Sequence, residues 1–311
     1  MIFTFFFPTI AKRGLLLYNL NMGLFSKLFK FKSKKQKADQ TQKKLGLALS
    51  GGGAKGFAHI GVLAAFEEEG IRFDYVSGTS AGSLVGALYC AGYDCESMLS
   101  FARTIKMSEI RNSKMLLTPS KSTNLADVVR RSVGDLEIED LKTPFCCVAT
   151  DFLTGNEVVL DKGNLAMCVA ASCSAPVFFD GIDLDGKHLV DGGLTNNLPA
   201  DAAKKMGADV VVGVTLSNVG DVGTAGRNVF SALKASFNIA MKSTSYKGLS
   251  NSDFVIAPDM RGHRASMVSD IDLLVTAGYN AAKEVIPQIK QSLYPEKKSK
   301  KSKKEKKDGK Q

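Results

Sequence analysis

The sequence has no tryptophan, three histidines and no two cysteines in a CxxC arrangement. Zinc sites and redox-active disulfides need closely spaced cysteines or cysteines with histidines, so the composition disfavours both kinds of site. We therefore expect free, mostly buried thiols in a reducing compartment, and no metal site. The six cysteines concerned are Cys90, Cys95, Cys146, Cys147, Cys168 and Cys173.

Long apolar runs are also missing. No run reaches the roughly 18–20 residues that a membrane-spanning helix needs. The first apolar run, in residues 1–10, comes before Lys12 and Arg13, whereas a secretory signal carries its positive charge ahead of the apolar stretch. These features predict a cytoplasmic protein.

The middle of the chain has no excess of positive charge, although the whole chain carries a formal net charge of +10. Residues 1–44 contain ten lysines and arginines against one acid, and residues 295–311 contain nine lysines against three acids. Residues 45–294 are therefore mildly acidic. This distribution argues against nucleic acid as a partner of the folded domain.

The two basic ends call for a separate interpretation. In residues 22–32, MGLFSKLFKFK, apolar residues alternate with lysines, which is typical of a segment that lies on an anionic membrane surface. A disordered basic leader fits this segment equally well, and Met22 is a second candidate for the first residue. Residues 295–311 are of low complexity and should be disordered. We predict peripheral contact with the inner face of the membrane through these basic tails.

From residue 45 onward, short apolar runs alternate with helical patterns. Such alternation predicts one α/β domain over residues 45–294, with a mostly parallel sheet covered by helices on both faces. The expected strands are 45–50, 73–77, 145–150, 157–160, 187–190, 210–216 and 254–257. The expected helices are 57–69, 81–91, 95–105, 123–133, 163–172, 200–206, 227–247 and 270–292.

One candidate site lies between the second expected strand and its helix, where residues 78–82 read GTSAG. The spacing Gly-x-Ser-x-Gly is typical of a nucleophile elbow, a sharp turn that lifts Ser80 out of the strand. A pattern with three fixed positions recurs by chance, so other residues have to support a catalytic role for Ser80.

A second candidate is the glycine loop after the first strand, Gly51, Gly52 and Gly53. Backbone amides can converge on an anion where no side chain blocks the approach, so the loop fits an oxyanion hole. A phosphate loop fits less well, because a Walker motif ends in Gly-Lys-Ser/Thr and here Lys55 precedes Gly56. A structural tight turn stays open at this point.

The third candidate is Asp191, which is followed by two glycines at the end of an expected strand. Such an aspartate is more often a turn former. The three histidines are His59, His188 and His263. His59 lies in an expected apolar helix, so we interpret it as a structural histidine. A hydrolase triad could still be assembled from Ser80, either Asp151 or Asp191, and His263.

Four segments together carry a more specific signal: residues 51–63 (GGGAKGFAHIGVL), 78–83 (GTSAGS), 171–178 (ASCSAPVF) and 191–199 (DGGLTNNLP). In this order and spacing they resemble the patatin-like phospholipase family. Within it, the chain is similar to the bacterial members akin to the catalytic domain of neuropathy target esterase. The resemblance covers about residues 45–285.

The resemblance implies a three-layer α/β/α sandwich and a Ser-Asp dyad without histidine. Carried over by position, Ser80 is the nucleophile, Asp191 is the base, and the amides of Gly51, Gly52 and Gly53 form the oxyanion hole. The implied activity is hydrolysis of acyl esters, which needs no metal or organic cofactor. Because basic tails around an acidic domain suit recruitment to an anionic membrane, we expect the substrates to be fatty-acyl esters of phospholipids or lysophospholipids.

Two alternatives stay open beside this reading. One is a Ser-His-Asp esterase that acts on small soluble esters, and the other is a non-catalytic, membrane-associated module that binds an anion. Lys55 stands where the family commonly has arginine, so the positive charge is kept but the bidentate guanidinium fork is lost.

Overall fold

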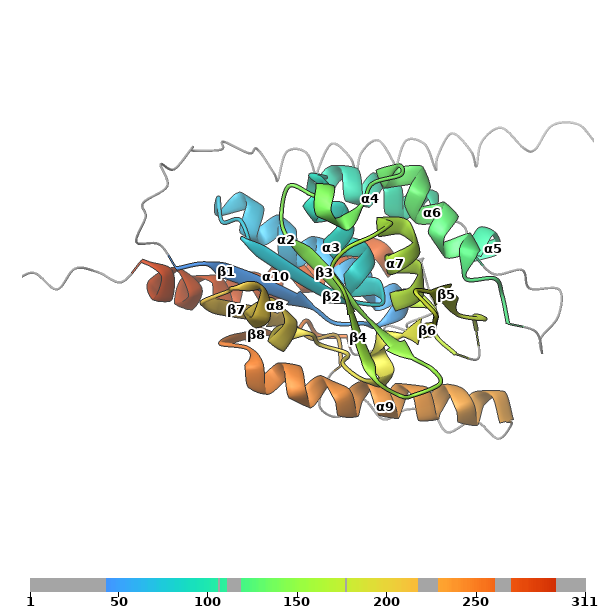
Figure 1. The fold of residues 1–311 in the computed structure, drawn as a ribbon. Helices are drawn as coiled ribbons and strands as arrows, with labels where there is room; N and C mark the ends of the chain where they lie inside the picture. The colour runs from blue at the N-terminus through green and yellow to red at the C-terminus, as the bar shows by residue number, and fades with distance from the viewer. Residues whose placement is uncertain are drawn as a thin grey trace, which may run out of the picture.

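A mixed sheet forms the centre of the protein in the computed structural model, which describes residues 43–105, 107–110, 119–176, 178–217, 229–260 and 270–294 (Figure 1). The basic segments 1–42 and 295–311, to which most of the predicted extension and tail belong, lie outside the described residues. The strands are β1 (Leu45–Leu49), β2 (Tyr75–Thr79), β3 (Phe145–Asp151), β4 (Glu157–Leu160), β5 (Ile182–Leu184), β6 (Lys187–Asp191), β7 (Val210–Val214) and β8 (Phe254–Ile256).

Within the sheet, five strands are parallel and three are not. The parallel strands lie in the order β3-β2-β1-β7-β8, which agrees with the predicted mostly parallel sheet. At the other end of the sheet, β4 and β6 pair antiparallel with β3, and β5 pairs antiparallel with β6. The central strand β1 is buried at all five positions, as expected for a parallel strand covered on both faces.

Helices cover both faces of the sheet and complete a three-layer α/β/α sandwich, as predicted. Figure 1 shows α2, α3, α4, α6 and α7 over one face and α8 and α9 over the other, while α10 packs along α2. The helices are α2 (Phe57–Glu68), α3 (Ala81–Ala91), α4 (Cys95–Thr104), α5 (Met107–Ile110), α6 (Thr123–Val133), α7 (Leu165–Cys173), α8 (Ala200–Met206), α9 (Val229–Asn251) and α10 (Ile271–Leu293). Short 3-10 turns are η1 (Gly53–Gly56), η2 (Ile138–Asp140) and η3 (Gly192–Leu194). None of the helices among the described residues is both long and apolar enough to cross a bilayer.

Strand β2 begins and ends two residues later than the sequence predicts. Asp74, which the sequence places in this strand, instead accepts a hydrogen bond from the Leu45 amide at 2.8 Å and so caps the start of β1. The strand continues through Ser77 and Thr79, whose hydroxyls donate to the carbonyls of Pro199 and Asn196, both at 2.8 Å. Buried polar residues can thus extend a strand when they find partners of this kind.

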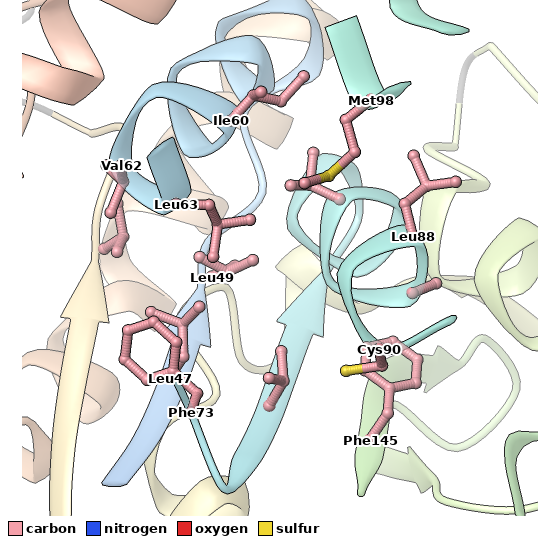
Figure 2. Close-up of a cluster of buried hydrophobic side chains, with 14 of the residues drawn as sticks. Leu47, Leu49, Ile60, Val62, Leu63, Phe73, Leu88, Cys90, Met98 and Phe145 are labelled. Carbon is pink, nitrogen blue, oxygen red and sulfur yellow. The ribbon is translucent and has the colours of Figure 1, made fainter. Parts of the chain in front are cut away.

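The hydrophobic core lies between the sheet and the helices α2, α3 and α4. Figure 2 shows Leu47 and Leu49 of β1 facing Leu63 of α2, with Met98 of α4 above α3. The six cysteines are free thiols, of which five are buried and Cys173 is half-buried, as predicted.

Helices α2 and α10 cross at very short range because a glycine stands on each side. A β carbon on Gly61 would overlap the carbonyl oxygen of Val275, and a β carbon on Gly278 would overlap the carbonyl oxygen of Ala58. Both glycines are therefore required by the close approach of the two backbones.

This crossing predicts that replacing a helix glycine by alanine, which stabilises an open helix, destabilises this protein. In an open helix, glycine to alanine stabilises by about 1 kcal/mol. We expect Gly61→Ala instead to lower the free energy of unfolding by about 1–3 kcal/mol, because the helices must move apart. Urea unfolding measures the change, and Thr276→Ala on the exposed side of α10 should stay within about 0.5 kcal/mol of wild type. A Gly61→Ala protein as stable as wild type would contradict the crossing.

Candidate active site

Ser80 stands in a strained turn between β2 and α3. Its backbone has φ 52° and ψ −124°, and a positive φ is costly for a residue with a side chain. The turn is fixed by hydrogen bonds: the Ser80 amide donates to Ser172 Oγ at 3.0 Å, and the Ser80 carbonyl accepts from Ser83 Oγ at 2.6 Å. This is the geometry of the predicted nucleophile elbow.

The two glycines of the elbow are required by contacts between backbones. A β carbon on Gly78 would lie 2.6 Å from the carbonyl oxygen of Gly82, and one on Gly82 would overlap the carbonyl oxygen of Leu49. Strand β1, strand β2 and helix α3 therefore meet with no room for a side chain at either position. The Gly-x-Ser-x-Gly spacing is a packing requirement of this structure.

The register of the sheet brings Asp191 to the end of β2. Strand β4 pairs with both Val148 and Ala149 along one edge of β3, so β2 and β6 share the other edge. On that edge Thr79 is the partner of Val148, and Asp191 is the partner of Ala149. Strands β2 and β6 thus run toward each other and end at adjacent positions. Asp191 occupies the ladder position that Ser80 would take if β2 continued.

The Asp191 carboxyl group is buried beside the elbow. Its side chain accepts a hydrogen bond from the Gly193 amide at 2.8 Å. Burial raises the pKa of Asp191 to about 6, while the Ser80 hydroxyl and the Gly193 amide oppose the rise. The structure therefore brings Ser80 and Asp191 together, and it gives the carboxyl group a pKa closer to neutrality than that of a free aspartate.

The glycine loop follows β1 and lies against the elbow. A β carbon on Gly51 would be 3.1 Å from Ser80 Cβ, so the loop backbone passes directly beside this serine. The Gly51 amide donates to the Asn197 carbonyl at 3.2 Å. Within the described part of the chain, no group accepts a hydrogen bond from the amides of Gly52 and Gly53. These two amides are therefore the donors that remain for an external anion.

Asn197 joins the glycine loop to helix α9, a function that sequence reasoning did not assign. Its Nδ2 donates to Ser245 Oγ at 3.0 Å, and Ser245 Oγ donates to the Met241 carbonyl at 2.8 Å. These bonds direct Oδ1 toward the glycines, where a β carbon on Gly51 would lie 2.6 Å from it. Oδ1 has no hydrogen-bond partner among the described residues. The only signal in the sequence was the position of Asn197 within the segment DGGLTNNLP.

Helix α9 covers the site through Met241 and Thr244. The Met241 side chain reaches both glycine turns, with Cε 2.9 Å from a β carbon placed on Gly51 and Cγ 2.8 Å from one placed on Gly193. Thr244 Oγ1 donates to the Gly193 carbonyl at 2.7 Å. A helix that begins 149 residues after Ser80 thus covers Ser80 and Asp191, which are 8% and 1% exposed.

His59 and His188, the two histidines among the described residues, form no hydrogen bond with Ser80. His59 is fully buried, its Nε2 lies 2.8 Å from the Ser50 carbonyl oxygen, and burial lowers its pKa to about 4, so it is structural as predicted. His188 bonds through Nδ1 to Asp183 Oδ1 at 2.7 Å. His263 lies outside the described residues.

The alternative acid, Asp151, is used within its own turn. Its carboxylate accepts from the Thr154 hydroxyl at 2.8 Å and from the Leu153 amide at 3.1 Å, and these bonds hold its pKa below the usual value. It stands two positions beyond Ala149 on β3, whereas Asp191 is the direct partner of Ala149. Of the two acids considered for Ser80, the structure brings Asp191 to it.

A strained serine at the carboxyl edge of an α/β/α sheet, beside a glycine turn, is an architecture of serine hydrolases. The family model of the patatin-like phospholipases matches residues 47–204, a range that includes Ser80, Asp191 and the glycine loop. The chain belongs to the patatin-like phospholipase family, as the sequence motifs predicted.

Several relatives carry the name of the predicted branch. The chain is 35% identical over 181 residues to an uncharacterized NTE family protein of Mycobacterium tuberculosis, covering 56% of this chain and 49% of that protein. It is 35% identical over 184 residues to lysophospholipase nte1 of Aspergillus fumigatus, covering 57% of this chain and 12% of the relative. It is 37% identical over 183 residues to human patatin-like phospholipase domain-containing protein 6, covering 56% of this chain and 13% of the relative. The matched region thus spans half or less of each relative's length.

Among solved structures, the fold is similar to that of VipD from Legionella pneumophila. The superposition has a TM-score of 0.55 and covers 85% of this chain and 73% of VipD, at 16% sequence identity. This likeness bears on the fold alone.

The buried carboxyl group predicts how stability depends on pH. Because the folded pKa of Asp191 is raised from 3.8 to about 6, the folded state binds a proton more tightly than the unfolded state does. Stability therefore falls as pH rises from about 4 to 6, by roughly 2–3 kcal/mol. Asp191→Asn removes the ionisation, so it should gain stability relative to wild type at pH 8, and this gain should shrink toward pH 4. Urea unfolding at both pH values measures the difference, and equal differences at the two would contradict the buried ionisation.

Proposed function

We propose that the protein is a serine acyl hydrolase that cleaves fatty-acyl esters of phospholipids or lysophospholipids through a Ser80–Asp191 dyad. The observation that carries this proposal is the position of Ser80 beside the buried Asp191 carboxyl group, whose pKa its hydroxyl lowers, on an elbow that is strained and tightly packed. The name of a relative, lysophospholipase nte1, supports the substrate class.

In the first half-reaction, Ser80 Oγ attacks the ester carbonyl and its proton passes to the Asp191 carboxylate. The carbonyl oxygen gains the negative charge and is held by amides of the loop Gly51, Gly52 and Gly53, chiefly those of Gly52 and Gly53. The ester bond then breaks, and the leaving alcohol takes the proton from Asp191. The product is an acyl-enzyme on Ser80.

In the second half-reaction, water attacks the acyl-enzyme and gives its proton to Asp191. The water oxygen forms a new bond to the acyl carbon, and the bond from that carbon to Ser80 Oγ then breaks. This releases the fatty acid, and Asp191 returns the proton to Ser80 Oγ. Every proton in this cycle moves between Ser80, Asp191, water and the substrate. Side chains and backbone amides of the chain are sufficient for these steps.

An aspartate can act as this base because of where it lies. A free aspartate has a pKa of about 3.9 and takes protons poorly at neutral pH. Burial raises the pKa of Asp191 to about 6, which brings it closer to the working pH of a cytoplasmic enzyme. The Gly193 amide orients the carboxyl group through one oxygen.

The basic segments 1–44 and 295–311 complete the proposal. Lysines near an anionic membrane surface contribute about 1 kcal/mol each to binding. We expect the two segments to recruit the mildly acidic domain to the cytoplasmic face of a membrane, where its ester substrates are found.

The dyad predicts which substitutions abolish turnover. Ser80→Ala and Asp191→Asn should each lower kcat on phospholipid and lysophospholipid esters by about 10³-fold or more, because each removes a group that acts in both half-reactions. His188→Ala and His263→Ala are the controls and should keep activity within a few-fold of wild type. A panel of lipid and short-chain esters, with circular dichroism to confirm folding, measures these effects.

The alternatives give different outcomes in the same panel. A triad esterase on small soluble esters requires His263→Ala to abolish turnover while Asp191→Asn leaves a substantial remainder. A non-catalytic anion-binding module requires that no ester in the panel is cleaved by wild type. Undiminished turnover in Ser80→Ala would refute the dyad.

The raised pKa also predicts the pH profile. Asp191 must be ionised to accept the Ser80 proton, so kcat/KM should rise about tenfold per pH unit below about 6 and level off above it. The measurement is kcat/KM on a soluble ester between pH 4.5 and 8. A profile flat through this range would contradict the role of a buried Asp191.

A further inference from the structure

Helix α9 is anchored to the domain by its C-terminal half. There a β carbon on Gly248 would overlap the Leu198 carbonyl oxygen, so the helix backbone lies directly on the loop that precedes α8. Lys247 forms ion pairs with Glu157 at 2.7 Å and with Asp201 at 2.9 Å. Together with Met241 and Thr244, these contacts fix this half of the helix over the site.

The N-terminal half of α9 has a largely apolar face that is turned to solvent. Exposed fractions are 77% for Val229, 49% for Leu233 and 69% for Ile239. At 100° per residue, this face holds Val229, Ala232, Leu233, Ile239 and Ala240, with the small residue Ser236 among them. The opposite face carries Ser231, Lys234, Asn238 and Lys242. A surface helix normally turns such an apolar face toward the core, whereas this face remains in solvent.

The direction of α9 places this face beyond the carboxyl edge of the sheet, the edge at which Ser80 lies. Helix α9 leads into β8, which is parallel to β7, so its C-terminal end lies at the amino edge of the sheet. Its N-terminal half therefore extends past the carboxyl edge, where Ser80 lies, and the 12 residue steps from Val229 to Met241 span about 18 Å. Phe152 and Leu153 are 55% and 80% exposed and follow β3 at this same edge. Figure 1 shows α9 as a long helix along the lower face of the sheet.

The charges of α9 fit an anionic partner. The helix contains three lysines and no acidic residue. Lys247 is paired with acids of the domain, whereas Lys234 and Lys242 form no ion pair with a described residue. A helix with an apolar face and lysines on the opposite face is of the kind that lies in the interface of an anionic bilayer, with its lysines reaching the headgroups.

We propose that residues 229–240, together with the turn at Phe152 and Leu153, form a docking surface that inserts into an anionic phospholipid bilayer and holds the carboxyl edge of the sheet, where Ser80 lies, against it. The choice of a bilayer as the partner rests on the proposed lipid substrate as well as on these charges. The surface is distinct from the basic tails, because its contribution is apolar and should resist salt.

The test is co-sedimentation of the full-length protein with vesicles of phosphatidylcholine and phosphatidylserine at about 1 M salt, where a Debye length of about 3 Å screens the lysines of the tails. The double variant Leu233→Ser/Ile239→Ser should bind at least about tenfold more weakly than wild type, since two inserted apolar side chains are lost. The matched control, Leu233→Met/Ile239→Met, keeps apolar side chains at the same positions and should bind as wild type does.

Two further readouts separate this proposal from the proposed function. Ser80→Ala should bind vesicles as wild type does, and the double serine variant should cleave a short soluble ester at the wild-type rate while losing turnover on vesicles. Equal binding of the serine and methionine variants would overturn the docking surface without touching the dyad. Wild type that does not bind vesicles, but forms a dimer that the serine variant dissociates, would also overturn it and assign the face to a second copy of the chain.

Discussion

The geometry around Ser80 depends on β2 and β6, two strands that pair with the same edge of β3 and end beside each other. Because β6 ends with Asp191 beside Ala149, strand β2 cannot extend past Thr79, and the chain must leave the sheet at Ser80. The positive φ of Ser80 is the backbone conformation that makes this departure possible within one residue. The same geometric conflict thus produces the elbow and places a carboxyl group beside its hydroxyl.

This arrangement lowers the stability of the fold in two ways, and interactions of the surrounding structure have to offset both. A strained Ser80 costs on the order of 1–3 kcal/mol, and an ionised buried Asp191 adds a cost of similar size. The offset comes from hydrogen bonds to Ser172 and Ser83 and from backbone contacts at glycines, which over-determine the turn. Because the costs fall on the two residues proposed to react, removing either residue is expected to trade activity for stability.

The fold was predictable where local pattern decides it. The predicted helices 123–133 and 200–206 coincide with α6 and α8, because each has a clear apolar period and a recognisable end. Strand β5 (Ile182–Leu184) was missed, since three residues leave no period to detect. The antiparallel pairing of β6 with β3 was not predicted either, because it joins residues some 40 positions apart and no local pattern specifies the partner.

The site was predictable to a similar extent. Ser80, Asp191 and the glycine loop stand in motifs because backbone geometry restricts which residues fit there, so their types and spacing are visible in the sequence. Asn197 and Met241 reach the same place from distant segments, and their contacts depend on the tertiary structure. The solvent-facing apolar face of α9 could not be predicted, because an amphipathic pattern does not say which face the domain covers.

The central claim is that Asp191 activates Ser80. The most direct measurement is the rate at which a fluorophosphonate forms a covalent adduct, with mass spectrometry of the peptide that contains Ser80. The dyad predicts an adduct on Ser80, none in Ser80→Ala, and labelling slowed by about 10²-fold or more in a folded Asp191→Asn protein, with His188→Ala unaffected. Labelling of Asp191→Asn at the wild-type rate, or an adduct on another residue, would contradict the claim.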